Sequence, residues 1–406
     1  MLKKLRVNGR DVRGVNRLII DGIVGVVDLV EAMHYNIASV PGMRARPKRD
    51  RTTGITRLVY RSIRGVAGLV GQGLDRLLAR LEPMLGERSG ASPRREALLA
   101  ALNGVLGDYL AASNNPLAIP MHLRRGGIPL PGEHEQLAAA IPQAGGKLVV
   151  LLHGLCMNDL QWKRKGHDHG AALARDLAYT PVYLHYNSGL HVSTNGRAFA
   201  ELLESLVQRW PAPLNELVLI GHSMGGLVAR SACHYGAMAR HEWPRHLDKL
   251  VFIGTPHHGA PLERGGNWVD KLLSSSAYSA PLARLGKIRS AGITDLRFGN
   301  LVDDDWKKRD RFERTGDLRV PIPLPEGVAC YAIAASTGRK PGGLGERLLG
   351  DGIVPLASAL GRHANRRLAL TFDESRQWVA YGASHLDLLS RPEVYAQIKR
   401  WLGAPG

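Results

Sequence analysis

The feature that most constrains this chain is an apolar strand followed at once by a tight glycine turn. Leu217–Ile220 leads into Gly221-His222-Ser223-Met224-Gly225, and a helix-forming segment follows from 224 to 235. In such a strand–turn–helix unit the residues two before and two after the serine need minimal side chains, and both are glycine here. We therefore expect the Ser223 hydroxyl at the carboxyl end of a strand, beside the positive end of a helix.

Strands and helices alternate along the chain on both sides of this turn. Short, wholly apolar strands separated by helices are typical of a parallel sheet that is covered on both faces. A hairpin is expected at 119–127 where the chain enters the sheet. The expected strands are 147–152, 181–186, 216–220, 249–254 and 329–334, and the expected helices are 169–178, 194–209, 224–235 and a last helix from Pro392.

The first 115 residues have a different pattern. Apolar residues recur three or four apart from Val12 to Ile37 and again over 55–85, and a third helix is expected at 94–112. Residues 1–80 hold 16 Lys or Arg and 6 Asp or Glu, so they carry more than half of the net charge of +18. We expect a basic amphipathic helical region over 1–115 and an α/β domain over 116–406, with a helical cap inserted at about 259–325.

A serine hydroxyl is a weak nucleophile at neutral pH, so Ser223 needs a base, a group that orients the base, and donors for an oxyanion. After a strand–turn–helix nucleophile, the acid and then the histidine follow in the chain. Asp351, in Gly350-Asp351-Gly352, is the preferred acid, and His385 is the preferred base. The alternatives are Asp303, Asp304, Asp305, Asp317 and Asp373 for the acid and His363 for the base.

Five features together resemble bacterial lipases and esterases of the inositol-deacylase-like branch of the α/β-hydrolase family. They are Leu-Leu-His-Gly at 151–154, Gly-His-Ser-Met-Gly-Gly at 221–226, Gly-Thr-Pro-His-His-Gly at 254–259, Gly-Asp-Gly-Ile-Val-Pro at 350–355 and the late His385. The resemblance covers about 147–402. It implies an α/β-hydrolase fold and hydrolysis of a carboxylic ester, with a lipophilic acyl group, through an acyl-enzyme on Ser223.

Two backbone groups are expected to bind the oxyanion. The N–H of Met224 is one donor, because the turn directs it toward the serine. By resemblance the second donor follows His153-Gly154, which makes Leu155 the first choice and Cys156 the weaker one. His222, beside the nucleophile, is expected to pack rather than to react.

Metal, cofactor and nucleic-acid chemistry find little support. His167-Asp168-His169 and His257-His258 lack the spacing of zinc motifs, so loop-orienting roles are favoured and no metal or cofactor is predicted. The positive charge comes without a nucleic-acid reading motif, so no nucleic-acid partner is expected. The expected partners are a small-molecule or lipid ester and, through residues 1–115, an anionic membrane surface; structural packing of that region is an equal alternative.

Cysteine usage and the N-terminus bear on the compartment. Three scattered cysteines, Cys156, Cys233 and Cys330, favour a reducing environment, and Asp21 and Asp28 interrupt the apolar run that a signal peptide needs. We expect a cytoplasmic protein that contacts the inner membrane surface peripherally if it contacts membrane at all. Two other functions stay open: acyl transfer, or deacylation of a lipid head group or polyester, with the same triad; and lipid-surface binding by a vestigial hydrolase domain.

Overall fold

The computed structural model describes residues 10–22, 61, 93–259, 289–307, 316–339 and 350–404. The chain divides into two compact units, Met1–Arg95 with Leu110–Ala118, and Glu96–Tyr109 with Ile119–Gly406. The expected helix at 55–85 lies outside the described residues, apart from residue 61, and so do 260–288 and 308–315 of the expected cap. The boundary at residue 115 and the helical cap therefore stay predictions.

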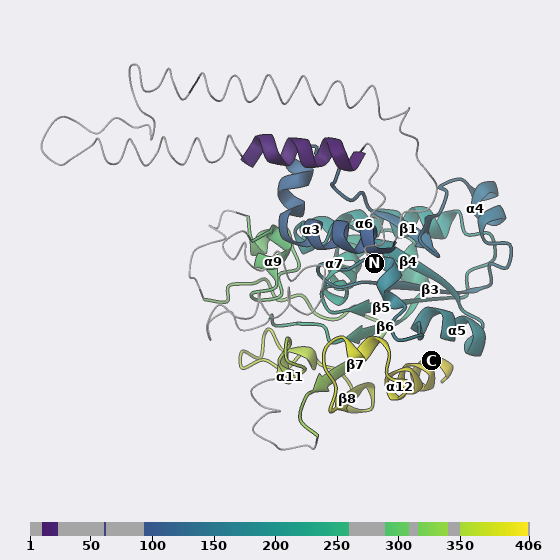
Figure 1. Cartoon of the computed structure of the whole chain (residues 1–406). Coiled ribbons are helices and arrows are strands. Elements are labelled where there is room, and N and C mark those ends of the chain that lie inside the picture. The colour runs from purple at the N-terminus through teal and green to yellow at the C-terminus, as the bar shows by residue number, and fades with distance from the viewer. Residues whose placement is uncertain are drawn as a thin grey trace, which may run out of the picture. The chain divides into compact units, whose positions relative to one another are not determined.

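The larger unit is built on an eight-stranded sheet with the order β2-β1-β4-β3-β5-β6-β7-β8 (Figure 1). β1 is antiparallel to both β2 and β4, and every pair from β4 to β8 is parallel. This mostly parallel sheet with an antiparallel edge confirms the predicted α/β-hydrolase fold class. The strands are β1 His122–Arg125, β2 Ile128–Pro129, β3 Lys147–Leu152, β4 Thr180–His185, β5 Glu216–His222, β6 Leu247–Ile253, β7 Ala329–Ser336 and β8 Gln377–Tyr381.

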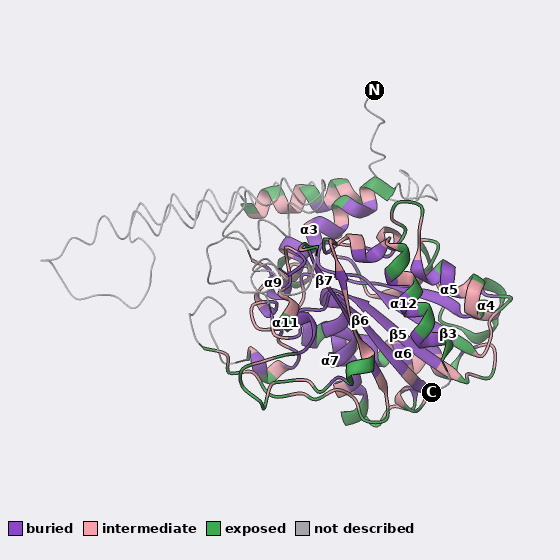
Figure 2. Cartoon of the chain, turned by 90° about the horizontal axis from the view of Figure 1, so that it is seen from below, coloured by how far each residue is buried: buried purple, intermediate pink, exposed green. Residues whose placement is uncertain are grey.

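Alternate side chains of the central strands enter two separate apolar cores, as the two-residue period of a strand requires. In β3, Leu148 and Val150 belong to one core, and Val149 and Leu151 belong to the other. All four side chains are fully buried, and each such burial contributes about 1.5–3 kcal/mol. Figure 2 shows the strands as the buried interior of the unit.

Helices cover both faces of the sheet. α6 (Val192–Gln208) and α7 (Met224–Met238) pack on the first core, and α5 (His169–Leu177) and α12 (Pro392–Gly403) pack on the second. These elements begin within two residues of their expected starts. The remaining helices are α3 Pro93–Ala112, α4 His134–Ala140, α9 Ala291–Asp295 and α11 Leu356–Ala359, with short 3-10 turns at Asp159–Trp162, Trp243–His246, Asp303–Asp305, Glu374–Arg376 and Asp387–Leu389.

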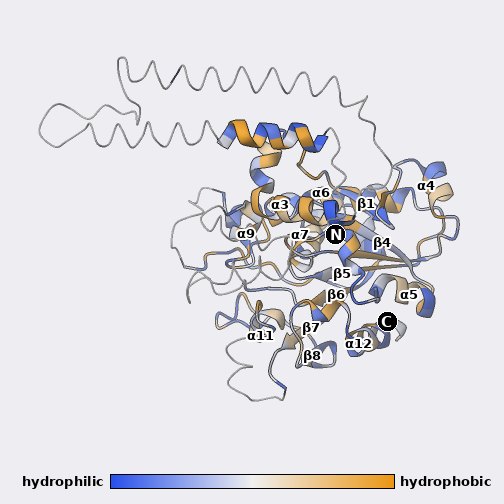
Figure 3. Cartoon of the chain, viewed as in Figure 1, coloured by the Kyte–Doolittle hydropathy of each residue, from blue (hydrophilic) through white to orange (hydrophobic). Residues whose placement is uncertain are grey.

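In the smaller unit a helix covers residues 10–22. Asn115 Nδ2 donates to the carbonyl oxygen of Gly14 at 3.0 Å, and Arg95 forms an ion pair with Asp11 at 2.5 Å. Figure 3 shows apolar and charged residues mixed along this helix. No helix among the described residues combines the length and the apolar character that crossing a bilayer requires.

Candidate active site

Ser223 occupies the turn between β5 and α7 in a conformation that L-residues avoid. Its φ of 53° and ψ of −124° lie outside the regions open to side-chain-bearing residues. The Ser223 N–H donates to the carbonyl oxygen of Ile253 at 2.8 Å, and the Gly226 N–H donates to the carbonyl oxygen of Ser223 at 3.1 Å. Such strain persists only where surrounding contacts impose it, and it is concentrated at functional sites.

The two flanking glycines have the steric role that the sequence pattern indicates. A Cβ atom at Gly221 would lie 2.5 Å from the Cα of Gly226, and one at Gly225 would lie 2.7 Å from the carbonyl oxygen of His153. Real Cβ atoms do not approach backbone atoms so closely. Larger residues at either position would force the turn apart.

Asp351 and His385 lie together in the second half of the chain. The Nδ1 of His385 lies 2.6 Å from Oδ2 of Asp351, and both residues are about 3% exposed. The other carboxylate oxygen accepts the N–H groups of Ile353 at 2.9 Å and Val354 at 2.7 Å. The His385 N–H also donates to the backbone oxygen of Asp351 at 3.2 Å. Side-chain and backbone contacts thus fix this pair.

The end of β6 brings His385 close to the serine turn. A Cβ atom on Gly254 would lie 3.1 Å from ring atoms of His385, while the preceding Ile253 accepts the N–H of Ser223. The rings of His385 and His222 are 4.8 Å apart between centroids. The buried Nε2 of His385 has no hydrogen-bond partner among the described residues, and no hydrogen bond to the Ser223 hydroxyl is formed.

The expected oxyanion donors both border this serine. Met224 is the first residue of α7, and Leu155 lies in a turn in which the Met157 N–H donates to the carbonyl oxygen of Gly154 at 3.3 Å. A Cβ atom on Gly154 would lie 3.0 Å from the Cβ of Ser223, so this turn is adjacent to the serine. The N–H of Cys156, the weaker candidate, already donates to Ser188 Oγ at 3.0 Å.

The other predicted acids are engaged away from His385. Asp303 forms ion pairs with Arg197 and with Lys307. Asp317 forms an ion pair with Arg319, and Asp304 is exposed. Two carboxylates accept backbone N–H groups, Asp305 from Leu301 and Val302 and Asp373 from Ser375. The Nε2 of His363, the alternative base, lies 3.7 Å from Oδ2 of Asp317.

His222 is buried and packs between aromatic rings, in line with the packing role expected for it beside Ser223. Its ring centroid lies 4.8 Å from that of His385 and 6.3 Å from that of Trp162. Burial holds the pKa of His222 well below its usual range, so the ring is neutral. His222 therefore fills space next to His385 without adding a charge to the site.

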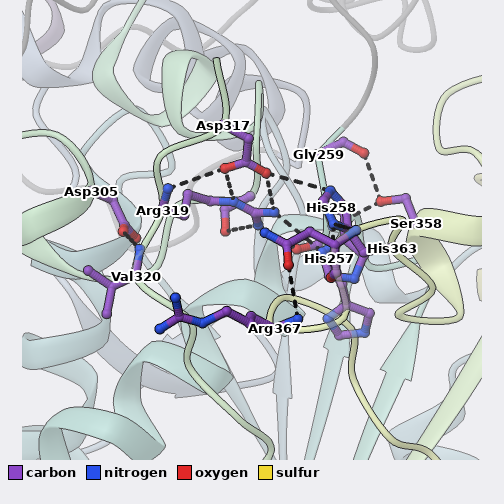
Figure 4. Close-up of polar contacts among 12 residues, drawn as sticks. His257, His258, Gly259, Asp305, Asp317, Arg319, Val320, Ser358, His363 and Arg367 are labelled. Carbon is purple, nitrogen blue, oxygen red and sulfur yellow. Dashed lines mark hydrogen bonds and ion pairs between the residues drawn. The ribbon is translucent and has the colours of Figure 1, made fainter. Parts of the chain in front are cut away.

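The pair His257-His258 lies in a polar cluster with Arg319 and Asp317 (Figure 4). Arg319 donates to both carboxylate oxygens of Asp317 at 2.9 and 2.8 Å and to the backbone oxygen of His257 at 2.9 Å. Burial lowers the pKa of His258 to about 4 and keeps its ring neutral. These contacts orient loops. The part of the chain that the structure describes contains no group of three or more His, Cys, Asp or Glu side chains arranged to hold a metal ion.

His167, Asp168 and His169 connect the start of α5 to neighbouring elements. Asp168 Oδ1 caps α5 by accepting the Ala171 N–H at 2.9 Å, and it also accepts the Tyr183 hydroxyl at 2.6 Å. His169 Nε2 lies 2.9 Å from the carbonyl oxygen of Leu388. This segment has a structural role at the start of a helix.

The contact of α3 with the turn next to Ser223 was not predicted from the sequence. The middle of α3, at Gly104, lies against Cys156, and Ser188 after β4 accepts the Cys156 N–H. The signal for this contact in the sequence is a run of small residues along one side of the helix: Ala97, Ala100, Ala101, Gly104 and Gly107. Such a run indicates close packing, but it does not identify the partner.

A protein-family model and several solved structures are similar to parts of this chain. Residues 143–321 match the family model described as the PGAP1-like alpha/beta domain. No curated protein sequence matches the chain. Among solved structures, the mature Bacillus licheniformis lipase BlEst2 is 17% identical and aligns over 70% of this chain and 97% of its own, with a TM-score of 0.40. Aspergillus fumigatus lipase B is 12% identical over 70% and 56%, with a TM-score of 0.42, and Clostridium botulinum EstA is 13% identical over 64% and 87%, with a TM-score of 0.38.

Proposed function

We propose that this chain, whose residues 143–321 match the model of a PGAP1-like alpha/beta domain, is a serine hydrolase that cleaves carboxylic esters through an acyl-enzyme. Ser223 is the nucleophile, His385 is the base and Asp351 orients the base. The backbone N–H groups of Met224 and Leu155 stabilise the oxyanion.

One observation carries the proposal. Asp351 binds the Nδ1 side of His385, while the buried Nε2 has no hydrogen-bond partner among the described residues, at the end of the sheet where Ser223 occupies its strained turn. A carboxylate can only accept, so Nδ1 carries the proton and Nε2 keeps its lone pair. An imidazole in that tautomer is ready to act as a general base.

In the acylation step, Ser223 Oγ attacks the ester carbonyl carbon and His385 Nε2 takes the hydroxyl proton. The electron pair of the carbonyl moves to its oxygen, and the N–H groups of Met224 and Leu155 donate to the resulting oxyanion. Collapse of this intermediate breaks the bond to the alcohol oxygen, which takes the proton back from His385. Asp351 stabilises the imidazolium in between without becoming protonated.

In the deacylation step, water takes the place of the alcohol. His385 Nε2 removes a proton from this water, whose oxygen attacks the acyl carbon, and the Ser223 oxygen leaves with that proton. The products are a carboxylic acid and free enzyme. The chain's own residues supply each proton transfer, so the step needs no cofactor.

Esters with a lipophilic acyl group are the proposed substrates. The test is the rate of hydrolysis of p-nitrophenyl esters of rising acyl length, together with labelling by a fluorophosphonate probe. We expect hydrolysis and labelling in the full-length protein, and neither in Ser223→Ala. No hydrolysis of any ester and no labelling at Ser223 would overturn the proposal and favour the vestigial lipid-binding alternative.

Acyl transfer by the same residues is distinguished by the acceptor. A hydrolase releases the free acid even when an alcohol is added, whereas an acyltransferase forms a new ester with the alcohol in preference to the acid. Product analysis in the presence of glycerol separates the two.

A peripheral contact with an anionic lipid surface is a second proposal, and the helix over 10–22 favours it. Val12, Val15 and Ile19 lie on one side of this helix and are 41%, 49% and 57% exposed. Arg10, Arg13 and Arg17 add positive charge along the same helix. Exposed apolar residues beside basic ones are typical of interfacial helices.

A further inference from the structure

We infer that the middle of helix α3, residues 96–109, is a positioning element of the active site that holds the turn Gly154–Met157 in the conformation that presents the Leu155 N–H to the oxyanion. This inference rests on the proposed function, because it assigns a role within that catalytic site. It also places part of the catalytic apparatus before residue 143, where the matched family segment begins.

Gly104 is the point of closest approach. A Cβ atom at this position would overlap the Sγ of Cys156 and would lie 2.9 Å from both the Cα and the N of Cys156. The Cys156 thiol also points back at the helix, with Sγ 3.8 Å from the carbonyl oxygen of Ala101. The backbone of the turn therefore lies directly on the helix, and only glycine permits this separation.

Cys156 needs external support because its φ of 59° is in the left-handed region. Its N–H donates to Ser188 Oγ at 3.0 Å, and Ser188 belongs to the loop that follows β4. Gly104 supports the turn from the helix side. Leu155 precedes Cys156 directly, so a change in the Cys156 backbone moves the Leu155–Cys156 peptide and, through the Leu155 Cα, shifts the Leu155 N–H.

Ion pairs and hydrogen bonds on both sides of the Gly104 contact hold the helix in place. Near its start, Glu96 binds Arg124 at 2.8 Å, and Arg124 lies 3.3 Å from Asp159, which follows the turn. Further along, the carbonyl oxygen of Gly104 accepts the Ser290 hydroxyl at 2.6 Å, and the Asp108 carboxylate accepts the Ala291 N–H at 3.0 Å. A helix held at several points acts as a rigid support for the turn.

The contact with the loop after β4 is equally close. Asn187 Nδ2 donates to the carbonyl oxygen of Gly107 at 2.9 Å, and a Cβ atom on Gly189 would lie 2.7 Å from the N of Gly107. Ser188, which holds the Cys156 N–H, lies between these two residues. The helix therefore supports the turn directly through Gly104 and indirectly through the loop that carries Ser188.

The test is Gly104→Ala in the full-length protein, with Gly403→Ala as the matched control. Gly403 also lies in a helix of the larger unit, and a Cβ atom there meets only Leu177 Cδ2, at 3.5 Å. We expect Gly104→Ala to lower kcat roughly 10- to 100-fold with little change in KM, since loss of one oxyanion donor costs about 100- to 1,000-fold in kcat and misplacement costs less. Affinity for a trifluoromethyl ketone, which forms an oxyanion on Ser223, should fall by a similar factor, while inhibition by the product carboxylic acid should not.

Rescue separates positioning from general destabilisation. Adding Cys156→Gly to Gly104→Ala removes the overlapping Sγ and supplies a residue that adopts a positive φ freely. The double variant should recover only part of the lost kcat, because the added Cβ would still lie 2.9 Å from the backbone Cα and N of residue 156. A lower thermal midpoint with unchanged kcat per folded molecule in Gly104→Ala would overturn the inference.

Hydrogen exchange provides a readout that does not depend on activity. Gly104→Ala should speed exchange of the peptide that contains residues 153–158, and Gly403→Ala should not. Unchanged exchange would overturn the inference whatever the catalytic result. An inactive wild-type protein without fluorophosphonate labelling would instead overturn the proposed function, so the two failures are distinct.

Discussion

The Nδ1 of His385 lies 2.6 Å from Oδ2 of Asp351, and both residues are buried at the carboxyl end of the sheet. The other Asp351 oxygen accepts two backbone N–H groups, so the carboxylate is fixed before it meets the histidine. This contact sets the tautomer of His385 and directs Nε2 away from Asp351.

Replacing the nucleophile is expected to abolish ester hydrolysis. Ser223→Ala removes the oxygen proposed to form the acyl-enzyme, and the rate should fall on the order of a million-fold. Circular dichroism should show a folded protein, because alanine is smaller than serine and the turn glycines are intact. Ser205→Ala, on the partly exposed side of α6, is the control and should retain full activity. A Ser223→Ala rate within tenfold of the parent would exclude Ser223 as the nucleophile.

The acid and the base are tested together. Asp351→Asn and His385→Ala should each lower kcat by roughly a thousandfold or more, with a smaller effect on KM. Asp303→Asn and His363→Ala are the controls, because Asp303 binds Arg197 and Lys307 while His363 lies beside Asp317. Steady-state kinetics on a short ester give both constants. A control as damaging as its partner would mean that the acid or base is misassigned.

Much of the fold was predictable because its strongest signals are local. β3 coincides with the expected strand at 147–152, and α3 and α12 begin within one residue of their expected starts, since apolar periodicity and proline positions are read directly from neighbouring residues. The strand–turn–helix at Ser223 was predictable for the same reason.

Long-range contacts were less accessible to sequence analysis. The approach of Gly104 to Cys156 joins residues that are far apart in the chain, and no periodicity encodes which loop a glycine on a helix will meet. The pairing of Asp351 with His385 is also long-range. It could be anticipated only from the order of residues in a known class of enzyme, and nine other aspartates lie between Ser223 and His385 in the sequence.

The oxyanion donor on the loop can be tested by removing its hydrogen. Leu155 occupies the second position of the turn Gly154–Met157, where proline is favoured in common turns. Leu155→Pro should therefore keep the turn but delete the N–H, and kcat should fall about 100- to 1,000-fold. Leu155→Ala keeps the N–H and controls for the loss of a buried side chain. Equal kcat for the two variants would exclude the Leu155 N–H as an oxyanion donor.

Two buried histidines make stability depend on pH. Burial lowers the pKa of His153 to about 3 and that of His169 to about 4. In the unfolded chain histidine has a pKa near 6.5, so below that pH these residues bind protons in the unfolded state but not in the folded state. The free energy of unfolding should fall as pH drops from 7 to 5, by about 2 kcal/mol for each of these residues.

Urea unfolding at the two pH values measures this dependence. His169→Asn removes one titrating group, so the difference between pH 7 and pH 5 should shrink by about 2 kcal/mol, whatever its effect at pH 7. Leu177→Ala, in the same helix, should lower stability equally at both pH values. An unchanged difference in His169→Asn would mean that His169 is not held neutral in the folded protein.

Contact with an anionic lipid surface is tested by flotation of the full-length protein with vesicles that contain phosphatidylserine. Each Lys or Arg near such a surface adds about 1 kcal/mol of attraction, which salt screens. Flotation should therefore occur at low salt and weaken at high salt. A triple variant with Val12→Ser, Val15→Ser and Ile19→Ser should float less, because it removes exposed apolar side chains from the helix over 10–22.

The control is Ile128→Ser with Met238→Ser, which removes exposed apolar side chains from the larger unit and should float like the parent. Hydrolysis of a short soluble ester should be the same in all three proteins. Equal flotation of the triple variant and the parent would exclude this helix as the lipid contact, and no flotation by any of them would favour structural packing of residues 1–115.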